Sequence, residues 1–279
     1  MATEAEILSF FCRHLIGIGW YEGTVDERGE FTSEPIFYGA SGFLLQPHEN
    51  ISTYSLVTAG HVLRDHDARM RKPNMATRQP SLFDIWGPHS KCSERIPFDL
   101  FDAPALGDYD KEEGIDFAVV ALPDLVLQLL GQTTIPFTKR NWIHQSDVVF
   151  DFFAMLGLPN EEAEQVRSKR DGIESITTFQ NPVLLFVEPC ELPPTIEPSV
   201  QPQFVGRIDS RVDVKSIVGM SGGPILGFRK DADGQLAYCP VAIQSRWLPD
   251  SRIVIGSFVA PLAAGIEEWI DRFIEESAA

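Results

Sequence analysis

The chain has 279 residues, of which 44% are hydrophobic and 10% are aromatic, so it is long and apolar enough to bury a sizeable core. Its 40 acidic and 23 basic residues give a formal net charge of −17 at pH 7, which repels nucleic-acid phosphates and anionic membrane surfaces. We therefore expect no nucleic-acid partner and no membrane partner. The sequence also lacks a run of about 20 apolar residues that could span a bilayer.

The N-terminal segment, residues 1–15, carries acidic residues where a secretion signal would carry Lys or Arg. Arg13 and His14 also interrupt its apolar run. This pattern argues against a secretion signal and predicts a cytoplasmic location. We expect a short helix from Thr3 to about Arg13.

The cysteines lie far apart and lack the short paired spacing of zinc sites; they are Cys12, Cys92, Cys190 and Cys239. A reducing compartment argues against disulfides as well. We therefore expect four buried thiols, and the sequence gives no reason to expect a metal or a cofactor.

Eight short runs rich in β-branched and aromatic residues are separated by Gly, Pro and Asp. In chain order they are "FYGASGFLLQP", "YSLVTAGHVL", "IDFAVVALP", "DVVFDFFAMLGLP", "PVLLFVEPCEL", "FVGRIDSRVDV", "YCPVAIQSRW" and "IVIGSFVAPL". Runs of this kind at irregular short spacing predict an antiparallel β-barrel or sandwich.

The last segment of the chain has a helical pattern. From Pro261 to Glu276, apolar residues recur at the spacing of an amphipathic helix: Ile266, Trp269, Ile270, Phe273 and Ile274. We expect this helix to dock on the preceding barrel as a terminal cap. Another short helix is predicted from Pro123 to about Gly131.

Two polar stretches, 64–80 and 160–175, are interpreted as surface loops. Residues 131–147 are the best candidate for a linker between two halves of comparable size.

The stretch "IVGMSGGPI", Ile217–Ile225, surrounds one hydroxyl with three glycines and a proline. Glycine suits positions where the backbone takes a positive φ or approaches another group closely. Such a loop can direct the amides of Gly219 and Ser221 into one small space. Because a serine hydroxyl is a poor nucleophile near neutral pH, catalysis by Ser221 would also need a base and a group that orients the base.

Among the six histidines, His61 is the best candidate for that base, since "SLVTAG" before it predicts a strand that runs into a small-residue turn. The other histidines lie in polar loops or have no comparable setting; they are His14, His48, His66, His89 and His144.

Asp116 is the best candidate for the orienting carboxylate, because it begins the otherwise apolar run "IDFAVVAL", where a charged group needs a partner. The acidic residues just before it are better interpreted as solvated surface charge; they are Asp108, Asp110, Glu112 and Glu113.

"VTAGHVL" around His61, "IDFAVVAL" around Asp116 and "GMSGGPI" around Ser221 resemble, in the same order, three motifs of the trypsin-like, chymotrypsin-fold serine peptidases in their signal-less bacterial form. The resemblance covers roughly 16–274. It implies an all-β fold of two antiparallel β-barrels, with the active site between them and a C-terminal amphipathic helix.

The implied organisation is an N-terminal segment at 1–15, a first lobe at 16–130 with His61 and Asp116, a linker at 131–147, a second lobe at 148–260 with Ser221, and a C-terminal helix at 261–279. The resemblance also implies roles. Ser221 would be the nucleophile, His61 the base and then the acid, and Asp116 the orienting group. The amides of Gly219 and Ser221 would form the oxyanion hole.

The sequence departs from the best-known members of this family just before the nucleophile. They carry an Asp there, which pairs with a newly cut N-terminus, whereas this chain has Met220.

The resemblance further suggests a specificity pocket edged by Gln244, Ser245 and Arg246, with Lys215 near its floor, which would favour an acidic residue before the scissile bond. Two alternatives stay open: Lys215 as a solvated lysine at a strand end, and Arg246 as a surface residue beside Trp247.

Three functions remain to be compared. The first is an intracellular serine endopeptidase that acts on a protein or peptide substrate. A role in stress or antiviral defence and a regulatory protein partner would go with this first function. The second is a regulatory module that keeps the fold in order to bind a partner. The third is an esterase or other acyl hydrolase that uses the same three groups.

Overall fold

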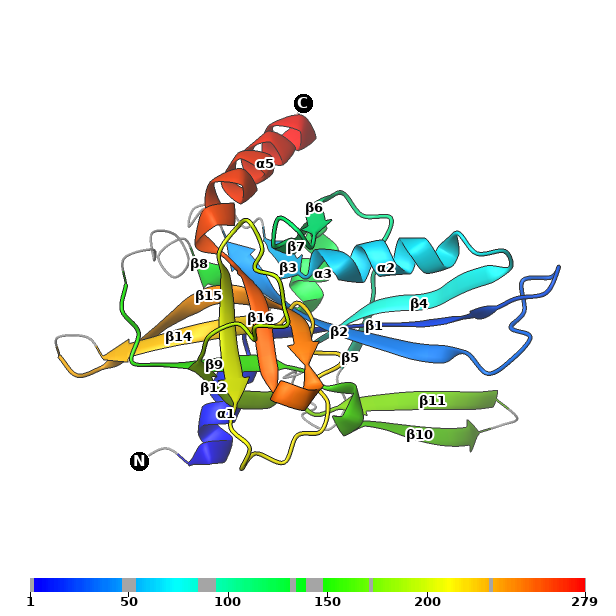
Figure 1. Ribbon diagram of the computed structural model, residues 1–279. Helices are drawn as coiled ribbons and strands as arrows, with labels where there is room; N and C mark the ends of the chain where they lie inside the picture. The colour runs from blue at the N-terminus through cyan, green and yellow to red at the C-terminus, as the bar shows by residue number, and fades with distance from the viewer. Residues whose placement is uncertain are drawn as a thin grey trace.

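The computed structural model describes residues 3–46, 54–84, 94–130, 134–138, 148–170, 173–230 and 233–278. Within these ranges the chain is mostly β-strand, arranged in two lobes (Figure 1). The elements of the first lobe are β1 (Leu15–Thr24), β2 (Ile36–Gln46), β3 (Ser55–Thr58), α2 (Gly60–Met70), β4 (Met75–Asp84), β5 (Glu94–Pro97), β6 (Ala105–Asp110), β7 (Ile115–Ala121), α3 (Asp124–Leu130) and β8 (Phe137–Thr138).

The first lobe is a sheet in the order β5-β4-β1-β2-β3-β7-β6, in which neighbouring strands are antiparallel. The short strand β8 pairs with β2 in parallel. Part of the predicted linker therefore belongs to the first sheet, and the rest of that linker lies almost entirely outside the described residues. Strands β3 and β7 are almost wholly buried, as their apolar sequences require.

The elements of the second lobe are β9 (Phe152–Gly157), β10 (Ala163–Arg170), β11 (Ile173–Gln180), β12 (Val183–Pro189), β13 (Gln203–Ile208), β14 (Pro224–Lys230), β15 (Leu236–Leu248) and β16 (Ile253–Phe258), with short 3-10 turns at Asn160–Glu162 and Pro249–Ser251. Six of these strands close an antiparallel barrel in the order β12-β13-β16-β15-β14-β9. The predicted all-β fold class is confirmed: the second lobe is a closed barrel, and the first is the sheet described above.

Two helices lie at the ends of the chain. The C-terminal helix α5 (Ala260–Ala278) matches the predicted amphipathic segment, and its buried Ile266 and Ile270 join a core cluster that takes residues from both lobes. The N-terminal helix α1 (Glu4–Cys12) begins with a capping box, in which Thr3 and Glu6 each bond the other's backbone amide.

His14 follows α1 and connects parts of the chain that are far apart in sequence. It is 2% exposed, its Nδ1 lies 2.8 Å from the Ile135 carbonyl, and its Nε2 lies 2.7 Å from the Tyr238 hydroxyl. Its ring also stacks on Phe137. Burial lowers the pKa of His14 to about 4, so the imidazole is neutral in the folded protein at pH 7.

The segment 64–80 is not the surface loop that its polarity predicted. It contains most of α2 and the first half of β4. His66 within it is buried, stacks on Phe101 and bonds Thr77 through Nε2. Arg69 pairs with Glu22, which is only 1% exposed. Polar residues that face inward toward specific partners gave this helix the appearance of a loop.

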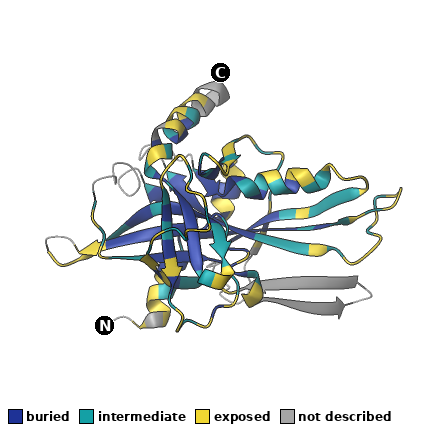
Figure 2. Ribbon diagram, viewed as in Figure 1, coloured by how far each residue is buried: buried dark blue, intermediate teal, exposed yellow. Residues whose placement is uncertain are grey.

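The segment 160–175 is also not a loop, because strands β10 and β11 form a long antiparallel hairpin across it. Figure 1 shows this hairpin projecting from the second lobe on the same side as the outer ends of β1, β2 and β4. The loop that joins β1 to β2 at those ends is largely exposed (Figure 2).

The thiols differ in their burial. Cys12 and Cys239 are buried, and burial raises the pKa of each to about 12. Cys190 is only half-buried, contrary to the prediction, and Cys92 lies outside the described residues. All three described thiols are free.

Candidate active site

His61 lies at the start of α2, directly after strand β3, rather than in a turn at the strand end. Gly60 before it packs so closely on β6 and β7 that a Cβ would lie 2.7 Å from the Phe117 carbonyl and would also overlap the Asp108 carbonyl. Only glycine allows this approach. The approach brings the His61 backbone against the first residues of β7.

Asp116, the second residue of β7, holds His61 by two hydrogen bonds. The His61 amide donates to Oδ1 at 2.9 Å, and the His61 Nδ1 lies 2.7 Å from Oδ2. The Asp116 side chain is 5% exposed, whereas the His61 side chain is 20% exposed. A carboxylate accepts from the Nδ1 proton, so this pairing selects the tautomer in which Nε2 is free to accept a proton.

The neighbouring acids have a different setting. Asp110 is exposed, and its carboxylate accepts from the amides of Glu112 and Glu113 within the β6–β7 turn. Asp108 is exposed as well. Among the described acidic side chains, Asp116 is the one that forms hydrogen bonds with His61.

The loop that carries Ser221 lies against the residues just before His61. Gly222 has a φ of +88°, and a Cβ there would lie 2.8 Å from the Ala59 amide nitrogen and would overlap the Thr58 hydroxyl. The Ser41 amide, in β2, donates to the Ser221 carbonyl at 2.9 Å. Ser221 of the second lobe is therefore brought to the end of β3 in the first.

Within the described residues, no hydrogen bond joins the Ser221 hydroxyl to His61. Such bonds are often long in unliganded enzymes and tighten when substrate is bound.

The Gly219 and Ser221 amides are oriented by the carbonyls that share their peptide groups. The Val218 carbonyl accepts from the Asn160 amide at 2.7 Å, and the Met220 carbonyl accepts from the Gly223 amide at 2.9 Å. The C=O and N–H of one trans peptide point in opposite directions. The two amides therefore point away from these partners, and among the described residues neither donates to a backbone carbonyl.

Met220 is fully buried beside strand β9. Its side chain occupies the space where a Cβ on Gly157 would lie, 2.8 to 3.0 Å from three Met220 atoms. An unbranched apolar side chain thus packs where a carboxylate would need an ionic partner.

Glu161 is a residue that sequence reasoning missed. It lies in the polar stretch that was interpreted as a loop, and its carboxylate accepts from the amides of Lys215 and Ser216, at 2.9 Å each. These two amides precede the Ser221 loop by only a few residues. No local pattern distinguishes Glu161 from the acids around it.

The residues predicted to edge the specificity pocket lie on β15. The Gln244 backbone bonds Gly222 and Gly223, and within the described residues its buried Oε1 has no partner. The Ser245 hydroxyl donates to the Ile255 carbonyl. Arg246 is half-buried, and Lys215 is exposed on the loop before Ser221. Their part in specificity stays a prediction.

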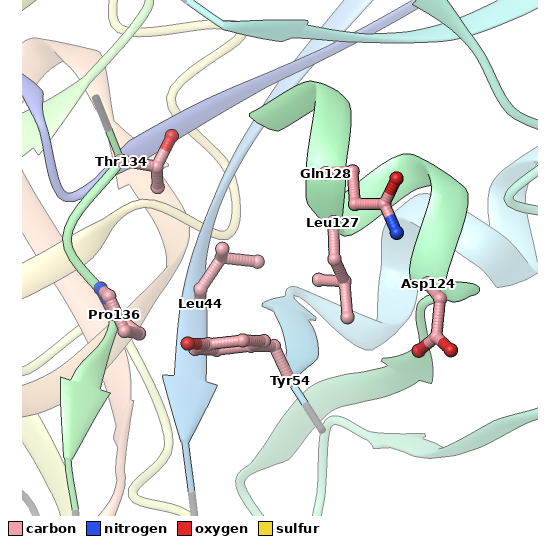
Figure 3. Close-up of a pocket in the computed structure, with 7 residues that line it drawn as sticks. All are labelled: Leu44, Tyr54, Asp124, Leu127, Gln128, Thr134 and Pro136. Atoms are coloured by element: carbon pink, nitrogen blue, oxygen red, sulfur yellow. The ribbon is translucent and has the colours of Figure 1, made fainter. Parts of the chain in front are cut away.

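A pocket of about 390 Å³ lies elsewhere in the first lobe. Figure 3 shows the Tyr54 ring below Leu44, with Leu127 and Asp124 of α3 to one side of them. Tyr54 precedes β3 and His61 follows it, so the pocket lies at the opposite end of that strand from His61.

Two further observations concern other classes of site. No helix in the described part of the chain is long and apolar enough to cross a membrane. The same residues contain no group of three or more His, Cys, Asp or Glu side chains that could hold a metal ion.

No protein-family model matches the chain, and no curated protein matches its sequence. Among solved structures, it is similar to the tobacco vein mottling virus protease, with 11% identity and a TM-score of 0.38 over 92% of this chain and 81% of that one. It is similar to the active form of a protease from M. tuberculosis, with 11% identity and a TM-score of 0.39 over 95% and 86%. It is also similar to a catalytically inactive tobacco etch virus protease complexed with substrate, with 12% identity and a TM-score of 0.34 over 87% and 77%.

Proposed function

We propose that the chain is a chymotrypsin-fold serine endopeptidase that uses Ser221, His61 and Asp116. The observation that carries this proposal is the double hydrogen bond from His61 to the buried Asp116 carboxylate. That bond fixes the ring and the tautomer of His61 beside the loop that bears Ser221. A histidine with a purely structural role would not need a buried carboxylate that bonds both its backbone amide and its ring. A catalytic base needs both its position and its tautomer fixed.

In the first half of the reaction, Ser221 Oγ attacks the carbonyl carbon of a peptide bond while His61 Nε2 takes the hydroxyl proton. The carbonyl electron pair moves to its oxygen, which the Gly219 and Ser221 amides stabilise. When the intermediate collapses, the C–N bond breaks and the imidazolium donates its proton to the leaving amine. The acyl group remains as an ester on Ser221.

In the second half, water attacks this ester and His61 takes a proton from the water. Collapse of the second intermediate releases the carboxylic acid, and the proton returns to Ser221 Oγ. Asp116 stays ionised throughout and stabilises the imidazolium.

The test is covalent labelling of purified protein by a fluorophosphonate probe, followed by digestion of casein and of a peptide library. We expect labelling of the wild type and none of Ser221→Ala, with peptide cleavage lowered by several orders of magnitude in the variant. Labelling that survives in Ser221→Ala contradicts the assignment of the nucleophile. A labelled wild type that cleaves small esters but no peptide indicates an esterase, and an unlabelled wild type indicates a binding module.

The peptide library also tests specificity. We propose a preference for Asp or Glu before the scissile bond, based on the positive charges of Lys215 and Arg246 on the two segments that flank the Ser221 loop. Lys215→Ala and Arg246→Ala should each lower kcat/KM for acidic peptides more than for neutral ones. Equal losses on both substrates contradict this preference.

We propose that the biological substrate is a protein of the cytoplasm. A more specific proposal is that the enzyme cleaves one partner protein in a stress or defence response. Cleavage-site profiling against a cytoplasmic proteome, with Ser221→Ala as the control, tests both. A limited set of cleaved proteins supports a dedicated partner, and indiscriminate cleavage contradicts it.

A further inference from the structure

Ser41 lies on β2 of the first lobe and is fully buried. Three hydrogen bonds connect it to the second lobe. Its amide donates to the Ser221 carbonyl at 2.9 Å, its hydroxyl donates to the Gly219 carbonyl at 2.9 Å, and its hydroxyl accepts from the Leu158 amide at 3.0 Å. No motif in the sequence marks this serine.

The direction of the hydroxyl bond is fixed by its partners. An amide can only donate, so the Leu158 N–H occupies a lone pair of Ser41 Oγ. A carbonyl can only accept, so the hydroxyl proton points to Gly219. The Ser41 hydroxyl thus satisfies one buried donor and one buried acceptor, both on the second lobe.

The two peptide groups that flank Gly219 can rotate more freely than others in the loop, because glycine has no Cβ to restrict them. The peptide before Gly219 is held through the Val218 carbonyl by the Asn160 amide. The peptide after Gly219 is held on both sides: its carbonyl accepts from Ser41, and its N–H, which belongs to Met220, donates to the Ile217 carbonyl at 3.0 Å. With both peptides fixed, the Gly219 N–H has one direction.

Ser41 is itself connected to the base side of the site. The Thr58 hydroxyl donates to the Ser41 carbonyl at 2.8 Å, and Thr58 precedes His61 by three residues at the end of β3. One chain of hydrogen bonds therefore runs from Thr58 through Ser41 to Gly219, across the boundary between the lobes.

We propose that Ser41 is a positioning residue for the oxyanion hole: through its hydroxyl, the first lobe holds the Gly219 amide of the second lobe toward the reacting carbonyl. This inference rests on the proposed peptidase function. It assigns Ser41 no contact with substrate.

The test is the kinetics of Ser41→Ala. Without the hydroxyl the Gly219 carbonyl loses its donor, and only the Met220 amide then holds the peptide after Gly219, so the Gly219 amide is held less firmly and stabilises the oxyanion less. Because that interaction forms only in the transition state, kcat should fall by about 10- to 100-fold while KM stays within about threefold. A peptide aldehyde, whose oxygen enters the hole after addition of Ser221, should bind weaker by a similar factor, whereas a cleaved product peptide should bind unchanged.

Ser81→Ala is the matched control. Ser81 is 2% exposed, lies on β4 of the same lobe and donates its hydroxyl to the Gln79 carbonyl at 2.9 Å. Both variants lose one buried hydroxyl and its bonds, so both should lower the melting temperature. We expect only Ser41→Ala to lower kcat.

The inference is overturned if, in an active wild type, Ser41→Ala keeps kcat within threefold of Ser81→Ala, or if only KM changes. If Ser41→Ala does not fold, Ser41→Cys replaces it, since a thiol is a weaker donor of similar shape, and a kcat equal to that of the wild type overturns the inference. An inactive wild type contradicts the proposed function, and this assignment with it.

Discussion

The Nδ1 atom of His61 lies 2.7 Å from Oδ2 of Asp116, while the amide of the same histidine donates to the other carboxylate oxygen. The carboxylate therefore fixes both the backbone and the ring of His61. It is buried at the second position of an apolar strand, where an ionised group without such partners would cost several kcal/mol.

Asp116→Asn should lower turnover by about 10⁴-fold and leave the fold nearly intact. The amide has the same shape as the carboxylate, but it favours the wrong tautomer of His61. Asp110→Asn is the matched control, because the bonds of that exposed carboxylate within the described residues are to local amides in the β6–β7 turn. The measurement is kcat/KM on one peptide for both variants. A large loss in Asp110→Asn together with a harmless Asp116→Asn would show that the wrong acid is assigned.

Gly219→Ala should lower kcat by more than the strain of a positive φ alone explains. Gly219 has a φ of +100°, and a Cβ would lie 2.6 Å from the Leu158 carbonyl and would overlap the Asn160 side chain. Gly29→Ala is the control, since its φ is +78° but nothing lies within 4 Å of a Cβ. Both changes carry the cost of a positive φ, of order 1 kcal/mol. We expect kcat to fall by 100-fold or more in Gly219→Ala only, and similar kcat values in the two variants would contradict the role of this loop.

The three residues proposed for catalysis could be singled out from the sequence because each lies in a short motif with its own local constraint. His61 follows the small residues Ala59 and Gly60, Ser221 lies among three glycines, and Asp116 begins an apolar run. These constraints act between neighbours in the chain, so the sequence displays them.

Ser41 and Glu161 could not be found in the same way. Ser41 contacts Gly219, which is 178 residues away, and Glu161 contacts the amide of Lys215, which is 54 residues away. A lone serine in a strand and one acid among several look ordinary until the lobes are brought together. The helix α2 was missed for a related reason. Its Arg69 looks like a loop residue in the sequence, but it is half-buried because it pairs with Glu22 in strand β1.

The stability of the protein should fall as the pH drops from about 6.5 to about 4, in part because of His14. Burial lowers the pKa of His14 from 6.5 to about 4. Between these values the unfolded chain binds a proton that the folded protein excludes, so stability is fully present above pH 6.5 and is lost on acidification. A pKa unit corresponds to about 1.4 kcal/mol, which gives a loss of roughly 3 kcal/mol across this range.

Urea unfolding of the wild type, His14→Gln and Tyr238→Phe at several pH values measures this contribution. His14→Gln should flatten the pH dependence of the free energy of unfolding. Tyr238→Phe removes the partner hydroxyl of His14, but burial raises the pKa of Tyr238 to about 12, so this variant should lower stability without flattening the curve. An unchanged slope in His14→Gln would show that other groups cause the acid sensitivity.

The Ser221 loop should adopt its catalytically competent conformation without a cut at the N-terminus. In the peptidases that this chain resembles, a carboxylate beside the nucleophile pairs with a freed α-amino group, but here the fully buried thioether of Met220 packs against Gly157. A thioether cannot pair with an ammonium group. Ile16, moreover, lies within β1, paired with Gly42 on one side and Asp84 on the other.

Protein with an uncleavable N-terminal tag should therefore react with fluorophosphonate as fast as untagged protein, while protein trimmed before Ile16 should lose α1 and His14 and melt at a lower temperature. Labelling that appears only after trimming would contradict this prediction and indicate activation by cleavage.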